Sequence, residues 1–200
     1  MGFLNIRFGS RLGSFTAVAI ALSLTASGCR PGNNSAESEL NSAITLENLE
    51  NNQTLVRNEP KGIQLITPNS WEQVDNLRPD ADIYIANEPE NTYVMVLVDS
   101  LSATVQQFTL SDNASQYRRV LVDQLDTYNG QTATSITSVN GQPAEQYEIR
   151  GEIDGTAIVY VHTTIRGEEN YYQVVGWTRD DQYDARRQEL QQVITSFRGV

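Results

Sequence analysis

The sequence predicts an α+β fold in which an antiparallel β-sheet carries helices on both faces, a three-layer arrangement. Three observations lead to this prediction. Residues 142–179 contain three strand-like runs joined by short turns, two strand-like runs are apolar on both alternating faces, and two other segments repeat apolar residues at helical spacing. Because a strand that is apolar on both faces needs cover on both sides, helices are expected above and below the sheet.

The three runs at the centre of this prediction are residues 144–149, 156–165 and 171–178. All are rich in Val, Ile, Tyr and Thr, whose side chains suit a pleated and packed surface. An Asp-Gly pair at 154–155 marks the first turn, and Gly167 marks the second. Connections this short join antiparallel neighbours, because parallel strands need a long crossover.

Four more strands are expected along the chain. They are residues 63–67, 82–86, 92–99 and 132–139. Residues 92–99 are apolar on both alternating faces, as are residues 156–165, so both runs are expected in the middle of the sheet.

Two amphipathic helices complete the predicted domain. The first is expected to be capped by Ser111 or Asp112 and to stop at Gly130, a residue suited to a left-handed helix end. The second is expected to be capped by Asp180 or Asp181. Their apolar stripes are Ala114, Tyr117, Leu121, Leu125 and Tyr128 in the first, and Tyr183, Leu190, Val193, Ile194 and Phe197 in the second.

Residues 1–28 are interpreted as a lipoprotein signal peptide. Two early arginines precede an apolar run, residues 12–24, that is too short to span a bilayer comfortably. The sequence Ala-Ser-Gly-Cys at 26–29 resembles the lipobox of bacterial lipoprotein precursors, in which the cysteine becomes the first residue and carries the lipid. Cys29 is the only cysteine of the chain and the predicted site of lipid attachment. The alternative is an ordinary secretory signal followed by an unpaired cysteine.

The rest of the chain is divided into a tether and a domain. Residues 29–60 are predicted to be the lipidated cysteine followed by a disordered tether, because they are rich in Asn, Ser and Glu and lack periodic hydrophobicity. Residues 61–200 are predicted to form one folded α+β domain. The chain carries 25 acidic and 14 basic residues, for a net charge of −11. It is therefore expected to be repelled by nucleic acid and by bare anionic lipid.

Several features together resemble the PsbP-like family, the extrinsic photosystem proteins and their bacterial relatives. They are Pro68 and Trp71 after the opening strand, an Asn-Gly-x-Pro turn at 140–143, a Tyr-rich set of strands, and a last helix that ends in Ser-Phe at 196–197. The resemblance covers about residues 61–198. It implies an antiparallel sheet with helices on both faces, and an accessory role beside a membrane complex.

The sequence offers little catalytic chemistry. His162 is the only histidine, and with no other histidine or cysteine nearby it is expected to be a hydrogen-bonded sheet residue rather than a zinc ligand. The resemblance keeps a metal-binding alternative open, because some PsbP-like proteins are thought to bind metals through His and Asp. No Ser-His-Asp pattern, Gly-rich phosphate loop or HExxH motif is present. We therefore expect no catalytic residue, no cofactor, no metal site and no enzyme activity.

Two further groups of residues are candidates for a site, one acidic and one aromatic. Neighbouring acidic residues are expected in solvated loops and caps; the pairs are Asp80 with Asp82, Glu88 with Glu90, and Asp180 with Asp181. The aromatic residues Trp71, Trp177, Tyr171 and Tyr172 are expected in the core, with a recognition surface or ligand cleft as the alternative.

The sequence thus predicts a non-enzymatic accessory protein, held by lipid on Cys29 at the extracytoplasmic face of a bacterial membrane, on the periplasmic or thylakoid lumen side. Its expected partner is a membrane-protein complex, a photosynthetic one among the candidates, which it would help to assemble or stabilise. The domain itself is expected to be monomeric. The alternative is a lipoprotein that binds a small or apolar ligand between sheet and helix, in a pocket lined by Tyr160, Tyr172 or Trp177.

Overall fold

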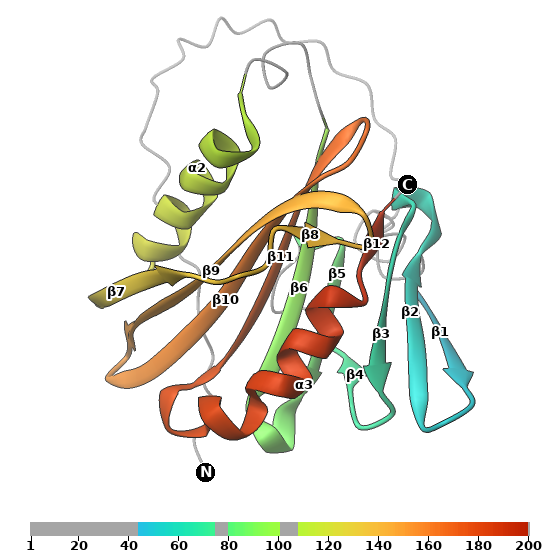
Figure 1. The fold of residues 1–200 in the computed structure, drawn as a ribbon. Helices are drawn as coiled ribbons and strands as arrows, with labels where there is room; N and C mark the ends of the chain where they lie inside the picture. The colour runs from blue at the N-terminus through green and yellow to red at the C-terminus, as the bar shows by residue number, and fades with distance from the viewer. Residues whose placement is uncertain (1–43, 75–79, 101–107, 200) are drawn as a thin grey trace, which may run out of the picture.

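The computed structural model describes residues 44–74, 80–100 and 108–199, whose strands form two antiparallel sheets (Figure 1). The larger sheet has the order β4 (Glu72–Gln73), β5 (Ile83–Asn87), β6 (Thr92–Ser100), β11 (Asn170–Arg179), β10 (Thr156–Arg166), β9 (Gln142–Ile153) and β7 (Thr127–Ala133), with β8 (Ser138–Val139) paired to β9. The smaller sheet has the order β1 (Ile44–Leu49), β2 (Gln53–Asn58), β3 (Ile63–Pro68) and β12 (Arg198–Gly199).

The predicted α+β class and the three central strands are confirmed. Strands β9, β10 and β11 are consecutive antiparallel neighbours, with His162 of β10 opposite Tyr147 of β9 and Val175 of β11. Strand β6 pairs with β11, so the two strands that are apolar on both faces lie inside the larger sheet, as predicted. The prediction of one sheet is wrong, because β3 lies in the smaller sheet.

Helix α2 (Leu110–Val122) begins and ends earlier than the sequence predicts. Its N-cap is Thr109, whose hydroxyl accepts a hydrogen bond from the backbone N–H of Asp112, while the Asp112 carboxylate accepts one from the backbone N–H of Thr109. This reciprocal capping box makes Asp112 the third helical residue rather than the cap. Beyond Val122, the chain turns to join the edge of the sheet, so Gly130 lies in β7, beside a β-bulge, and does not end the helix.

Helix α3 (Tyr183–Thr195) follows a single 3-10 turn, η4 (Asp180–Gln182). Asp180 and Asp181 belong to this turn, and neither caps α3; the N-cap residue is Gln182, without a side-chain cap bond. All five residues of the predicted apolar stripe are buried: Tyr183, Leu190, Val193, Ile194 and Phe197. The helix ends at Thr195, however, so Phe197 lies beyond it and the prediction of a helix that ends in Ser-Phe at 196–197 is wrong.

The predicted disordered tether is wrong for residues 44–60. They form the hairpin β1–β2 and a 3-10 turn, η1 (Glu59–Lys61), and β2 pairs with β3 along six residues of each strand. A polar segment can be ordered in this way because an existing strand supplies its backbone hydrogen-bond partners. Only one face of β2 is buried, through Thr54, Val56 and Asn58. The predicted signal peptide, residues 1–28, and residues 29–43 lie outside the described residues.

The core has two hydrophobic clusters. One contains Val159 and Val161 of β10 together with the buried stripe of α3. The other contains Ile158 and Tyr160 of β10 together with Leu121 of α2. Alternate residues of the same strand point to opposite faces of a sheet, so the two clusters divide the side chains of β10 between its two faces. Among the described residues, no helix is both long and apolar enough to cross a membrane.

Candidate functional site

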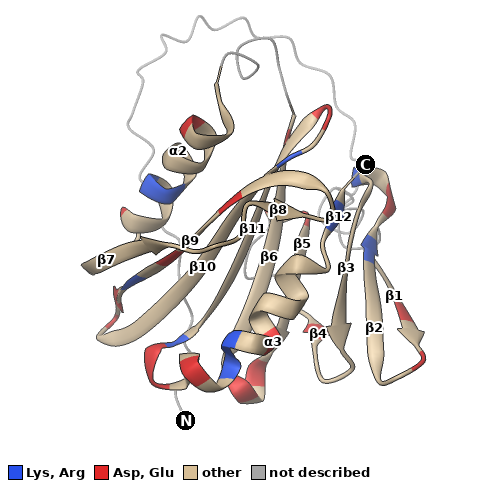
Figure 2. Ribbon diagram, viewed as in Figure 1, with Lys and Arg blue, Asp and Glu red and all other residues tan. Residues whose placement is uncertain are grey.

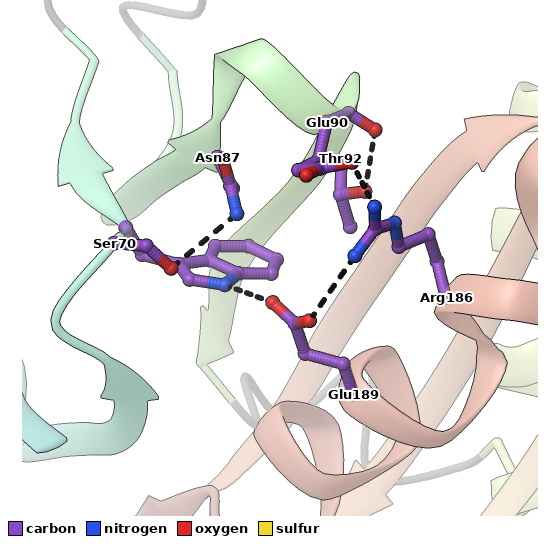
Figure 3. Close-up of polar contacts among 7 residues, drawn as sticks. Ser70, Asn87, Glu90, Thr92, Arg186 and Glu189 are labelled. Carbon is purple, nitrogen blue, oxygen red and sulfur yellow. Dashed lines mark hydrogen bonds and ion pairs between the residues drawn. The ribbon is translucent and has the colours of Figure 1, made fainter. Parts of the chain in front are cut away.

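A polar network joins the β3–β4 turn, the 3-10 turn η2 (Glu88–Glu90) and helix α3. The indole Nε1 of Trp71 donates to Oε1 of Glu189 at 2.6 Å. Figure 3 shows Arg186 between Glu90 and Glu189, and its guanidinium pairs with both carboxylates. Glu90 lies 96 residues before Arg186 in the sequence.

An open hollow of about 440 Å³ lies beside this network, between β4, β5 and η2. Glu72 and Glu88 are among its lining residues, and both are exposed. Among the described residues, no group of three or more His, Cys, Asp or Glu side chains is placed to hold a metal ion. The hollow is therefore a polar surface feature beside a network that attaches α3 to the sheet.

A second polar network is buried beneath α2 and is centred on His162. The Nε2 atom of His162 lies 2.9 Å from Oε1 of Gln173, which also accepts a hydrogen bond from Thr164 at 2.8 Å. The amide nitrogen of Gln173 donates to Oδ1 of Asn113 on α2 at 2.7 Å, and lies 3.4 Å from the carboxylate of Asp99 on β6. Three strands and a helix thus meet through one glutamine side chain.

These contacts fix the tautomer of His162. Because the amide nitrogen of Gln173 is directed to acceptors, its oxygen faces the imidazole, and Nε2 of His162 must carry the proton. The other nitrogen, Nδ1, is buried and has no hydrogen-bond partner among the described residues. The ring of Tyr117 stacks on the imidazole with centroids 5.1 Å apart.

Burial is the main cause that lowers the pKa of His162 from 6.5 to about 4; the hydrogen bond that His162 donates to Gln173 opposes this shift, and the positive charge of Arg118 adds to it. Burial also raises the pKa of Asp99. A histidine that is 0% exposed and neutral at physiological pH cannot exchange a proton with a solute at the surface. The structure therefore agrees with the prediction of a hydrogen-bonded sheet histidine.

The acidic pairs differ from the prediction in one case. The side chain of Asp82 is only 10% exposed, lies 2.9 Å from Nζ of Lys61, and accepts a hydrogen bond from the backbone N–H of Val98 at 2.8 Å. Asp82 is therefore a mostly covered residue that connects the turn η1 to strand β6, rather than a solvated loop residue. Asp180 and Asp181 pair with arginines at the surface, as residues of an exposed turn.

The aromatic residues singled out in the sequence are core residues. Trp71, Trp177, Tyr171 and Tyr172 are all at most 4% exposed. The ring of Trp177 stacks with that of Tyr84 and with that of Tyr93, at centroid distances of 5.7 and 5.2 Å. Sequence reasoning missed Glu189, Asn113 and Gln173, because nothing in their local sequence marks them as partners of Trp71 and His162. Cys29 lies outside the described residues.

Comparison with known proteins gives similarity at the level of the fold. No protein-family model matches the sequence, and no curated protein matches it. The structure is similar to the solution structure of cyanobacterial PsbP (CyanoP) from Synechocystis sp. PCC 6803, with a TM-score of 0.53 and 15% identity, over 74% of this chain and 93% of that one. It is also matched by LpqN, involved in cell envelope biogenesis of Mycobacterium tuberculosis, with a TM-score of 0.48 and 16% identity, over 72% of this chain and 88% of that one. The chain therefore has the fold of the PsbP-like proteins, which the sequence resemblance predicted.

Proposed function

We propose that this chain is a lipid-anchored, extracytoplasmic accessory protein that acts without catalysis, by binding a membrane-protein complex and supporting its assembly or stability. The periplasm and the thylakoid lumen both fit this proposal. The PsbP-like fold makes a photosynthetic complex one candidate partner. The acidic composition argues against nucleic acid as a partner.

The main support for the proposal is the small number of residues between Cys29, the proposed anchor residue, and the folded domain. Cys29 precedes Ile44, the first residue of β1, by 15 residues. Even when fully extended, a segment of this length reaches only about 50 Å. A lipid on Cys29 would therefore keep the whole domain within reach of proteins in the same membrane, which favours a membrane-bound partner over a soluble one.

The architecture proposed for the domain is the three-layer one, with α2 and α3 on opposite faces of the larger sheet. The division of β10 side chains between two clusters supports it, because each cluster contains one of the two helices. In this arrangement the helices shield the sheet faces, and the sheet edges, loops and outer helix surfaces remain for a partner.

The alternative, a ligand between sheet and helix, has less support. It needs a pocket lined by Tyr160, Tyr172 or Trp177, yet Tyr160 packs edge-on against Trp177 and Tyr172 packs against Phe197. Tyr160 and Tyr172 also belong to different clusters. These rings therefore pack against other aromatic rings of the core. An enzymatic role is disfavoured because the single histidine is buried, neutral and hydrogen-bonded.

Replacement of the anchor residue tests the proposal. Cys29→Ala should move the chain from the membrane fraction to the soluble fraction, and partners crosslinked to the wild-type chain in membranes should no longer be recovered with it. Ser35→Ala, just after the cysteine, is the matched control and should behave as wild type. Recovery of the wild-type chain alone after gentle crosslinking, or an unmodified Cys29 in its mass spectrum, would contradict the proposal.

A further inference from the structure

Besides the two-residue strand β8, which pairs with β9, the described sheets have four edge strands, and three of them have features that discourage pairing with another chain. Strands β4 and β12 have two residues each, and each includes a charged residue, Glu72 and Arg198. Strand β1 is longer but carries Glu47 near its middle. Short length and charge are the usual protections of a sheet edge, because an exposed edge otherwise offers its backbone groups to any extended segment.

Strand β7 lacks both protections. It has seven residues, none of them charged and none of them proline, and among the described strands it pairs only with β9. The uncharged stretch extends from residue 127 to residue 144 in a chain of which 20% is charged. In Figure 2, β7 is tan along its length, whereas the end of the molecule around the start of α3 is red and blue.

The backbone of β7 has hydrogen-bonding groups free to pair outward. Thr134 N–H donates to the carbonyl of Gln146, at the end of the β7–β9 ladder. Antiparallel pairs alternate between hydrogen-bonded and non-hydrogen-bonded, so Gln131 and Ala133, opposite Ile149 and Tyr147, direct their backbone groups away from β9. The bulge at Tyr128 and Gly130 precedes this regular segment.

Exposed apolar side chains flank the same edge. Tyr128 on β7 is 47% exposed, and Val120, in the last turn of α2 just before β7, is 48% exposed. They are two of only four large hydrophobic residues exposed among the described residues. Covering an edge that has unpaired backbone groups and exposed apolar side chains beside it is energetically favourable.

We propose that this edge pairs with β7 of a second copy of the same chain. In such a two-fold pair, a charge near the axis faces the same charge on the other copy, and an edge without charges avoids this repulsion. In a chain with a net charge of −11, an uncharged edge is therefore a place where two copies can approach with little local repulsion. A different protein could instead have supplied charges complementary to this chain, and an uncharged edge would not be needed.

The antiparallel register places Gln131 near the two-fold axis. The free groups belong to Gln131 and Ala133, so a ladder that pairs Gln131 with either of these residues of its mate sets it opposite residue 131 or 133. The acidic residue before β7, Asp126, then faces the uncharged segment that follows Ala133 in the other copy. The monomeric state expected from the sequence would be replaced by a membrane-bound dimer with one continuous sheet.

Disulfide trapping in the native membrane tests the pairing. Gln131→Cys in the full chain should give a crosslinked species of twice the chain's mass under mild oxidation. Thr45→Cys on β1 is the matched edge control, and the wild-type chain, whose only cysteine is Cys29, gives the background. No crosslink above this background, or a crosslink to a protein of different mass, would overturn the proposal.

A charge pair at the same position provides an independent measurement. Gln131→Glu and Gln131→Lys should each weaken self-association of the detergent-solubilised chain about tenfold or more, since like charges then face each other near the axis. Mixing the two variants should restore association, and Gln131→Asn should retain it. Equal association of all variants, or no recovery on mixing while both variants keep a cooperative melt, would refute self-pairing through β7. Neither result would affect the proposed anchoring.

Discussion

The Trp71 indole donates a hydrogen bond to the Glu189 carboxylate across 118 residues of sequence. Trp71 is 4% exposed, so its N–H depends on this one acceptor. The carboxylate is in turn held near Arg186, whose guanidinium also pairs with Glu90. Helix α3 is thereby attached to the β3–β4 turn and to η2 by polar contacts, in addition to its buried apolar stripe.

Glu189→Ala should destabilise the domain by about 1–3 kcal/mol, because it leaves a buried indole N–H without an acceptor. Glu189→Gln keeps an acceptor oxygen and should cost less. Gln188→Ala, at an exposed position of the same helix, is the control and should be nearly neutral. Urea denaturation midpoints would measure the three changes, and equal midpoints for Glu189→Ala and Gln188→Ala would show that the contact contributes nothing.

The hairpin β1–β2 should be part of the folding unit. A chain that starts at residue 44 should melt like the full chain, whereas one that starts at residue 61 loses β2, one of the two partners of β3, together with the buried side chain of Val56. Burial of that side chain alone is worth roughly 1.5–3 kcal/mol.

Point variants test the contribution of the hairpin to stability without shortening the chain. Val56→Ala should lower the melting temperature by several degrees, while Leu46→Ala, at a position that is 50% exposed, should change it little. Identical melting curves for the chains starting at 44 and 61 would show that residues 44–60 behave as part of the tether that the sequence predicted.

His162 should make stability depend on pH in a defined window. Its pKa is about 4 in the folded chain and 6.5 in the unfolded one. Above pH 6.5 the imidazole is neutral in both states and stability is complete. As the pH falls from 6.5 to about 4, only the unfolded chain takes up the proton, so roughly 3 kcal/mol of stability is lost; below about pH 4 there is no further loss from this residue.

His162→Gln should remove this dependence. Urea unfolding of both proteins between pH 7.5 and 4 would measure it. The comparison isolates His162 because Asp99, whose pKa is raised, acts in the opposite sense and is present in both proteins. Parallel stability curves for the two proteins would mean that the imidazole is already protonated in the folded state or exposed to solvent.

The sequence predicted the strands best where composition and turn residues agree. The runs that became β9, β10 and β11 combine branched or aromatic residues with glycine turns, and their order in the sheet follows from the short connections. The hairpin β1–β2 was missed because its own residues are polar and bury only one face. The hairpin is ordered because β2 pairs with the edge of β3, and the residues of the hairpin themselves give no sign of this pairing.

The hydrogen-bond partners in the polar networks could not be predicted from the sequence for a related reason. His162 and Gln173 are 11 residues apart, and only the β10–β11 register decides that Thr164, rather than His162, lies directly opposite Gln173. A shift of one residue would have turned the glutamine to the other face of the sheet. Asp82 was misjudged because its partners, Lys61 and Val98, lie on other strands or turns.

The closure of the smaller sheet has a kinetic consequence. Strand β12 completes that sheet by pairing with β3, and Ile66 donates to the hydroxyl of Ser196 across 130 residues. A chain delivered N-terminus first across a membrane cannot form these contacts until the residues around 196–199 have arrived. Folding dominated by such distant pairings is slow, in the range of milliseconds to seconds for β-rich domains. In a chain exported as proposed above, the open edge of β3 and the aromatic face of Tyr172, which Phe197 later covers, would for that interval be accessible to proteases and chaperones on the far side of the membrane.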